Sequence, residues 1–196
     1  MKILFATHNL HKLEEVKNIL GASYNLVSLK DLGLYEDIPE NEDTLPGNAR
    51  AKAEFVYTRY GQPCFADDSG LEVKALNGAP GVYSARYSGE TDPCLQNLAN
   101  INKLLFEMKD IADRSACFRT VIAYIDKTGV YYFEGKVQGI IEHDIKGNGG
   151  FGYDPVFTPD GYECRFSELS MAEKNKISHR GQAIRKFADF LSQCFA

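Results

Sequence analysis

The stretch KILFATHNLHKLEEVKNILGASYNLVSL, residues 2–29, decides the class of fold. An apolar run over residues 2–6 reads as a short strand, and apolar residues then recur at helical spacing over residues 10–20. Residues 24–29 again have the composition of a strand. A strand, a helix and a second strand in this order predict a crossover unit, and therefore an α/β protein.

The turn between the first strand and the helix carries a hydroxyl, an amide and an ammonium group. Thr7, Asn9 and Lys12 form the pattern T-x-N-x-x-K at a helix N-terminus, where free backbone N–H groups favour an anion. These side chains could converge on one phosphate. The alternative is that Thr7 and Asn9 only cap the helix and that Lys12 is solvated.

The segment FADDSGLEV, residues 65–73, brings two adjacent carboxylates to the end of a second buried strand. Neighbouring residues of a strand point to opposite faces, so Asp67 and Asp68 cannot both enter one cleft. Ser69 and Gly70 predict a turn after them. A carboxylate here could hold a metal ion, orient water, or cap the turn.

The remaining elements follow from periodicity and turn signals. Helices are expected at residues 48–60, 91–109 and 178–195, with a short helix opened by a capping box of Ser170 and Glu173. Strands are expected at residues 116–125, 130–137, 139–145 and 156–157. The expected buried positions of the three long helices are Ala49, Ala53 and Val56, then Leu95, Leu98, Ile101, Leu105 and Met108, and last Ile184, Phe187, Leu191 and Phe195.

Composition restricts the classes of protein. The 196 residues suit a single domain spanning residues 1–196, and a net charge of −5 argues against binding to nucleic acid or to an anionic membrane. Five cysteines without a CxxC pair read as reduced thiols with no zinc site. The apolar N-terminal segment is too short for a signal peptide, which makes the cytoplasm the expected location.

Several other positions have both a functional and a purely structural interpretation. Glu40 lies in an acidic loop, and with Asp68 it would make a hard oxygen site for Mg²⁺; alone it is a solvated acid. Lys52 is either a phosphate ligand or an exposed helical lysine. Phe151 is either a ring that stacks on a base or a loop anchor. His179 and Arg180 place cations at a helix start, which either suggests an anionic or keto-bearing partner or is only the start of a surface helix.

A glycine-rich loop matches a nucleotide-binding pattern only weakly. Gly147, Gly149 and Gly152 give GxGxxG, but this motif must follow a first strand and open a helix, whereas a β segment follows here. A nicotinamide or flavin site is therefore not expected.

Six segments of the chain carry a recognisable pattern: T-x-N-x-x-K at residues 7–12, E-x-x-x-T-L-x-x-N-A-x-x-K at 40–52, ADDSGLEV at 66–73, GAPGVYSARYSGE at 78–90, GGFGYDPVF at 149–157, and K-x-x-x-SHRG at 174–181. In this order and register, they resemble the inosine triphosphate / xanthosine triphosphate pyrophosphatase family. Together they span nearly the whole chain.

The resemblance implies a two-lobed mixed β-sheet flanked by helices, with a central substrate cleft and usually a homodimer. It implies Mg²⁺-dependent hydrolysis of dITP, ITP and XTP to the monophosphate and pyrophosphate, which removes deaminated purines from the nucleotide pool. Carried over by position, Glu40 and Asp68 bind Mg²⁺, and Asp68 is also the general base. The substrate ligands are Thr7, His8, Asn9, Leu10, His11, Lys12, Lys52, Ser69, Phe151, Gly152, Tyr153, Asp154, Lys174, His179 and Arg180.

Three positions depart from the family pattern. His8 stands where glycine is common, Leu45 where phenylalanine is frequent, and Gly47 where an acid is frequent. These differences are expected to tune affinity. Glu42 is the rival of Glu40 as second metal ligand, and Asp67 is expected to face away from the metal and to bond to backbone.

The chemistry implied for the base is recognition of the 6-keto oxygen. Arg180 and a protonated His179 only donate hydrogen bonds, so they match hypoxanthine and xanthine and oppose the 6-amino group of adenine. Two other classes stay open: a pyrophosphatase for modified pyrimidine nucleotides, and a nucleotide-binding module without catalysis.

Overall fold

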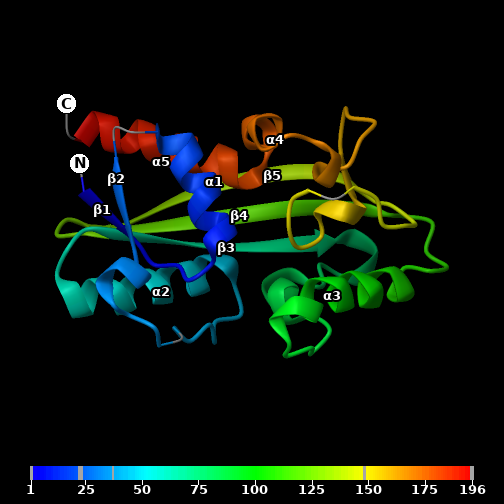
Figure 1. The fold of residues 1–196 in the computed structure, drawn as a ribbon, viewed down its shortest axis with the longest axis horizontal. Coiled ribbons are helices and arrows are strands. Elements are labelled where there is room, and N and C mark those ends of the chain that lie inside the picture. The colour runs from blue at the N-terminus through cyan, green and yellow to red at the C-terminus, as the bar shows by residue number, and fades with distance from the viewer. Residues whose placement is uncertain (1, 22–23, 37, 148, 195–196) are drawn as a thin grey trace. The chain divides into compact units, whose positions relative to one another are not determined.

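The computed structural model describes residues 2–21, 24–36, 38–147 and 149–194. Its strands form one six-stranded mixed sheet in the order β2-β1-β3-β4-β5-β6 (Figure 1). The strands are β1 (Lys2–Phe5), β2 (Asn25–Ser28), β3 (Cys64–Val73), β4 (Ser115–Asp126), β5 (Gly129–Ile141) and β6 (Phe157–Pro159). The helices are α1 (Leu10–Leu20), α2 (Leu45–Tyr60), α3 (Pro93–Glu107), α4 (Met171–Ile177) and α5 (His179–Cys194).

The chain forms two compact units. Unit 1 comprises Met1–Asp68, Thr120–Gly135 and His179–Ala196, and unit 2 comprises Ser69–Arg119 and Lys136–Ser178. Each unit has its own hydrophobic core. No helix of the described residues has the length and apolar character needed to cross a membrane.

In unit 1, helices cover both faces of the sheet, as the crossover unit predicted. β1 pairs in parallel with β2 and with β3. Ile3 and Phe5 pack with α1 and α5 on one face, whereas Leu4 packs with α2 on the other. Figure 1 shows α1 and α5 together on one side of these strands and α2 on the opposite side. The α/β class is confirmed.

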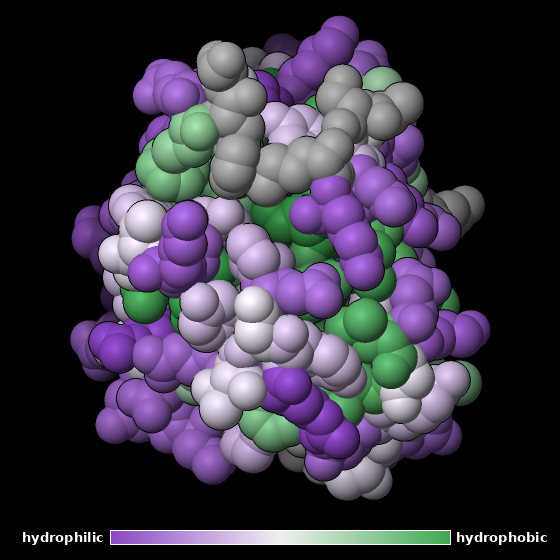
Figure 2. All heavy atoms as spheres, turned by 90° about the vertical axis from the view of Figure 1, so that its left-hand side faces the viewer, coloured by the Kyte–Doolittle hydropathy of each residue, from purple (hydrophilic) through white to green (hydrophobic). Residues whose placement is uncertain are grey.

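The face shown in Figure 2 carries both hydrophobic and hydrophilic side chains, and the hydrophilic ones lie between the hydrophobic groups. In the interior, Ala49, Ala53 and Val56 of α2 are buried as predicted. In α5, Ile184, Phe187 and Leu191 are also buried as predicted, and Phe195 lies outside the described residues.

In unit 2, the core gathers apolar side chains from strands and from α3. Leu71, Phe118 and Phe157 pack with Ile101 and Leu104. The capping box of Ser170 and Glu173 opens α4 as predicted. Two of the predicted buried positions of α3 were wrong, because Leu95 and Leu98 are about half exposed. Leu104, which was not predicted, is buried instead.

Three predicted boundaries were also wrong. No turn interrupts β3 at Ser69 and Gly70, since Gly70 stays extended and the strand continues to Val73. The runs predicted as 130–137 and 139–145 are one strand, β5, which ends at Ile141. Helix α2 begins at Leu45 and not at residue 48, because Thr44 caps it and Pro46 suits its first turn.

Candidate active site

The two adjacent aspartates of β3 point to opposite faces of the sheet in unit 1. Phe65 packs with α1 and α5, and Ala66 packs with α2. Strand alternation therefore aims Asp67 at the α1/α5 face and Asp68 at the α2 face. The hydrogen-bond partners of Asp67 and of Asp68 are accordingly different, and both aspartate side chains are buried.

Asp68 shares one ammonium group with Glu40. Lys52 Nζ donates to Asp68 Oδ1 at 2.9 Å and to Glu40 Oε1 at 2.6 Å. Lys52 is only 7% exposed and Asp68 only 6%. We call Glu40, Lys52 and Asp68 the carboxylate cluster. It brings together a predicted metal pair and a predicted phosphate ligand.

Asn48 holds the other side of Asp68. Its Nδ2 donates to Asp68 Oδ2 at 3.3 Å, and its Oδ1 accepts the backbone N–H of Glu42 at 3.0 Å. Asn48 is fully buried. The amide therefore ties the acidic loop to the middle of β3. Asn48 was not predicted as a site residue. Its spacing of one helical turn from Lys52 was the available signal in the sequence.

Gly47 is one of the departures from the family pattern, and its surroundings explain why glycine stands there. A Cβ on Gly47 would lie 2.8 Å from Glu42 Cβ and 2.9 Å from Thr44 Oγ1. Glycine therefore lets the acidic loop fold closely over the start of α2.

Of the two acids considered as the second metal ligand, Glu40 shares Lys52 with Asp68, whereas the backbone N–H of Glu42 donates to Asn48.

Burial and charge act in opposite directions in the carboxylate cluster. Burial lowers the pKa of Lys52, but Asp68 and Glu40 outweigh it, and the net pKa is raised. Burial raises the pKa of Asp68, and the attraction of Lys52 offsets this only in part. The lysine is thus firmly cationic, and Asp68 has the raised basicity that suits proton transfer.

On the opposite face, Asp67 joins a buried ion network with Lys12, Glu15 and Arg180. Lys12 Nζ lies 3.1 Å from Asp67 Oδ1, and Arg180 Nε donates to Asp67 Oδ2 at 3.2 Å. Arg180 Nη1 also donates to Glu15. Burial raises the pKa of Asp67, but Lys12 and Arg180 outweigh it and hold this pKa far below its usual range.

Two side-chain cations therefore contact the Asp67 carboxylate, whereas the sequence analysis named only backbone partners for it. Glu15 was not predicted. It lies three residues after Lys12 and beside the buried Val16 of α1, and no local pattern in the sequence marks its contact with Arg180. Gly135 lets β5 approach this region, since a Cβ there would lie 2.0 Å from His179 O.

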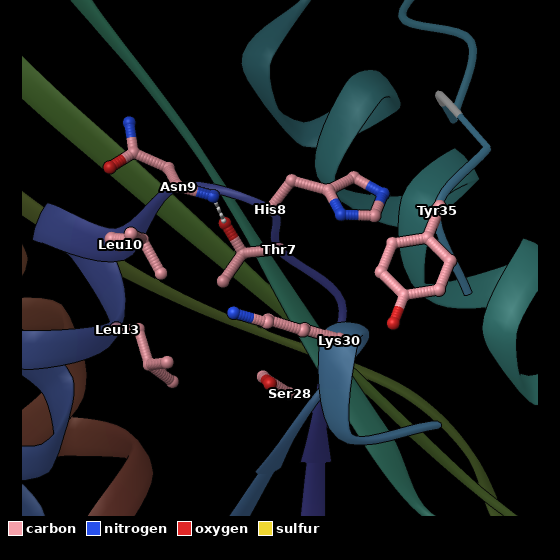
Figure 3. Close-up of a pocket in the computed structure, with 8 residues that line it drawn as sticks. All are labelled: Thr7, His8, Asn9, Leu10, Leu13, Ser28, Lys30 and Tyr35. Carbon is pink, nitrogen blue, oxygen red and sulfur yellow. Dashed lines mark hydrogen bonds between the residues drawn. The ribbon is translucent and has the colours of Figure 1, made fainter. Parts of the chain in front are cut away.

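The loop before α1 caps the helix and also lines a pocket. Asn9 caps α1 by accepting the backbone N–H of Lys12, and Thr7 Oγ1 accepts the N–H of Asn9 (Figure 3). The pocket measures about 200 Å³ and is lined by Thr7, His8, Asn9, Leu10, Leu13, Ser28, Lys30 and Tyr35. The Lys30 side chain points into it. Ser28, Lys30 and Tyr35 were not predicted.

In unit 2, a second cluster joins Phe151, Asp154 and Lys174, which we call the Phe151 cluster. Lys174 Nζ donates to Asp154 Oδ2 at 2.8 Å and lies 4.8 Å from the centre of the Phe151 ring. Asp154 Oδ2 also accepts the backbone N–H of Phe151 at 2.7 Å. Lys174 and Asp154 are both buried. Three predicted base-pocket residues therefore meet.

The other predicted ligands lie in several places. Leu10 and His11 are exposed in the first turn of α1, and His8 Nε2 contacts the backbone oxygen of Glu36 in unit 1. Gly152 and Tyr153 lie with Ser69 in unit 2. His179 and Arg180 belong to unit 1, so the structure does not test their predicted grouping with Lys174.

The donor set of the carboxylate cluster fits Mg²⁺. Across the described ranges there is no group of three or more His, Cys, Asp or Glu side chains that could hold a metal ion. Mg²⁺ needs only one or two carboxylates when water and substrate phosphates complete its shell. Glu40 and Asp68 already converge on one cation, the Lys52 ammonium, so both carboxylates are directed at the same point.

Comparison with known proteins identifies the family. The family model described as the Ham1 family matches residues 3–190. The chain belongs to the Ham1 family. A relative from Porphyromonas gingivalis named dITP/XTP pyrophosphatase is 54% identical, with 97% of each chain covered. One from Christiangramia forsetii with the same name is 48% identical, covering 98% of this chain and 100% of its own.

Solved structures of Ham1 proteins have the same fold. The Ham1 protein of Staphylococcus aureus superposes with a TM-score of 0.88 at 37% identity, covering 98% of this chain and 99% of its own. A dITP/XTP pyrophosphatase from Mycobacterium abscessus gives a TM-score of 0.77 at 40% identity, with coverage of 95% and 98%. The resemblance drawn from the six segments is confirmed.

Proposed function

We propose that this Ham1 protein is a nucleoside triphosphate pyrophosphohydrolase that converts dITP, ITP and XTP into the monophosphate and pyrophosphate. The observation that carries the proposal is the carboxylate cluster, where two carboxylates and one lysine meet beside the middle of β3. Relatives that share about half of the sequence are named dITP/XTP pyrophosphatase, which supports the choice of substrate.

The reaction is hydrolysis at the α-phosphorus. A water oxygen bonds to this phosphorus, the bond from it to the α–β bridging oxygen breaks, and pyrophosphate leaves. Asp68 accepts the proton of the attacking water, and its raised pKa suits this role. Asn48 fixes Asp68 through Oδ2, so the carboxylate keeps one orientation during proton transfer.

Glu40 and Asp68 would hold Mg²⁺, which supplies neutralisation of charge on the substrate oxygens. Lys12 and Lys52 offset the negative charge that builds on the leaving pyrophosphate. Thr7 and Asn9 contribute by fixing the start of α1, whose free N–H groups favour an anion.

The Phe151 cluster recognises the purine base. The Phe151 ring offers a stacking face, and its place is fixed because Asp154 bonds both to its backbone and to Lys174. His179 and Arg180 donate hydrogen bonds to the 6-keto oxygen, a pattern that opposes adenine. In Arg180 this role is added to the contacts with Asp67 and Glu15.

The test is a panel of nucleoside triphosphates with Mg²⁺, in which pyrophosphate and orthophosphate are measured separately. ITP, dITP and XTP are expected to yield pyrophosphate, and ATP is expected to react about 10⁴-fold less efficiently. Release of orthophosphate, preference for a modified pyrimidine nucleotide, or tight ITP binding without turnover would each reject the proposal. Homodimer formation and a cytoplasmic location remain predictions.

A further inference from the structure

The ammonium group of Lys52 lies between the two carboxylates that are expected to hold Mg²⁺. It is 2.6 Å from Glu40 Oε1 and 2.9 Å from Asp68 Oδ1. Ammonium-to-carboxylate contacts of this length are charge-assisted hydrogen bonds. One lysine therefore already satisfies an oxygen of each predicted metal ligand.

We propose that the Lys52 ammonium is a built-in counter-ion of the Glu40/Asp68 pair, and that a divalent cation must displace it to bind both carboxylates. This inference rests on the proposed function, since it concerns the same site. A divalent ion and an ammonium cannot both lie within bonding distance of the same two oxygens at the same point. Binding of one therefore weakens binding of the other.

The surroundings of Lys52 make this competition strong. Lys52 is 7% exposed and Asp68 is 6% exposed, so water screens their attraction poorly. Asn48 holds Asp68 Oδ2, which limits rotation of the carboxylate away from the lysine. Without its cation, the pair would leave Asp68 buried beside another acid at high cost.

A displaced Lys52 has an obvious second partner in the substrate. The triphosphate is anionic, and an ammonium released from Glu40 and Asp68 could pair with its phosphate oxygens. Lys52 would then favour metal binding together with nucleotide over metal binding alone. Its expected role changes accordingly, from a fixed phosphate ligand to a cation exchanged between carboxylates and substrate.

The test is the affinity for Mn²⁺, used as a spectroscopic probe in the absence of nucleotide, measured by electron paramagnetic resonance. Lys52→Met is expected to bind Mn²⁺ at least about tenfold more tightly than the wild-type protein, because the competing ammonium is gone. Lys17→Met is the matched control, since it removes one exposed charge from unit 1 without touching the cluster. Equal or weaker Mn²⁺ binding by Lys52→Met would overturn the proposal.

A second measurement uses the wild-type chain and does not depend on folding of the variant. Lysines are acetylated briefly by a small anhydride, with and without saturating Mg²⁺, and modification is quantified by mass spectrometry. Labelling of Lys52 is expected to rise several-fold with Mg²⁺, while labelling of Lys17 stays constant. Unchanged labelling of Lys52 at saturating Mg²⁺ would contradict displacement.

These outcomes can be separated from failure of the proposed function. If the nucleotide panel yields pyrophosphate but Mn²⁺ affinity is unchanged in Lys52→Met, the activity stands and the counter-ion role is wrong. If Mn²⁺ binds more tightly but no pyrophosphate forms, the counter-ion role stands and the proposed reaction is wrong.

Discussion

At the scale of single residues, two neighbouring aspartates have different surroundings because a strand alternates its faces. Asp68 faces α2, where a lysine and an amide contact it. Asp67 faces α1 and α5, where two cations hold it. Asp68 therefore has a chemical role, and Asp67 has a role in holding Lys12 and Arg180 in place.

Asp68→Asn should lower kcat by about 10²- to 10⁴-fold, because an amide cannot accept the proton of water. Since burial already disfavours the ionised form of Asp68, the amide should be tolerated by the fold. The measurement is pyrophosphate release from ITP, with circular dichroism to check folding. Asp160→Asn, at an exposed position, is the control. A variant with nearly normal kcat would remove Asp68 from the mechanism.

Asp67→Asn should destabilise the protein by about 3–5 kcal/mol at neutral pH, because Lys12 and Arg180 lose their buried counter-charge. The pKa of Asp67 is depressed from 3.8 in the folded protein, so its stabilisation is complete above that value and declines as the pH falls below it. The difference in unfolding free energy should therefore shrink in acid, by at most about 1.4 kcal/mol per pH unit.

Urea unfolding of the wild-type and Asp67→Asn proteins from neutral pH to about pH 3 measures this difference. A difference that is small at neutral pH, or that grows as the pH falls, would show that Asp67 does not carry the network.

At the scale of elements, helix α2 positions two of the side chains that contact Asp68. Thr44 caps its first turn, Asn48 and Lys52 are one turn apart on a buried face, and both reach Asp68. The position of the helix start therefore decides whether Asn48 is ordered.

Thr44→Ala should lower the unfolding free energy by about 1 kcal/mol, because the N–H of Gly47 loses its side-chain acceptor. Activity should fall modestly, since Asn48 lies in the turn that frays. Thr58→Ala, an exposed position of the same helix, is the matched control and should change little. Thermal unfolding and ITP turnover of both variants check this; equal behaviour would show that Thr44 does not anchor the helix start.

Much of the element order was predictable from the sequence, because local signals carry it. Asn9 and Gly21 mark α1, and the box of Ser170 and Glu173 marks the start of α4. The Ser69–Gly70 turn was wrong because pairing and burial in a sheet override a local turn preference.

The site was predictable only in part. The resemblance supplied Glu40, Lys52 and Asp68, which the structure brings together. Glu15 and the partners of Asp67 were not predicted, since contacts between residues as distant in sequence as Glu15 and Arg180 leave no local pattern. The pairing of Lys52 with both acids likewise needed coordinates.

At the scale of the whole molecule, the chemistry is divided between two compact units. Unit 1 carries the carboxylate cluster and the buried ion network, and unit 2 carries the Phe151 cluster. Substitutions in the carboxylate cluster and in the Phe151 cluster should therefore affect different kinetic quantities.

Lys174→Met should narrow the ratio of kcat/KM for ITP over ATP by at least about tenfold, because Asp154 and Phe151 lose the cation that positions them. Lys52→Met should instead lower kcat for both nucleotides and leave the ratio nearly unchanged. Steady-state kinetics with both nucleotides measure this. An unchanged ratio in Lys174→Met would remove the Phe151 cluster from base recognition.

The central claim is that water attacks the α-phosphorus, and hydrolysis of dITP in ¹⁸O-labelled water tests it most directly. Mass spectrometry of the products locates the incoming oxygen. We expect one ¹⁸O atom in the nucleoside monophosphate and none in the pyrophosphate. Label in the pyrophosphate, or release of labelled orthophosphate with a nucleoside diphosphate, would contradict it.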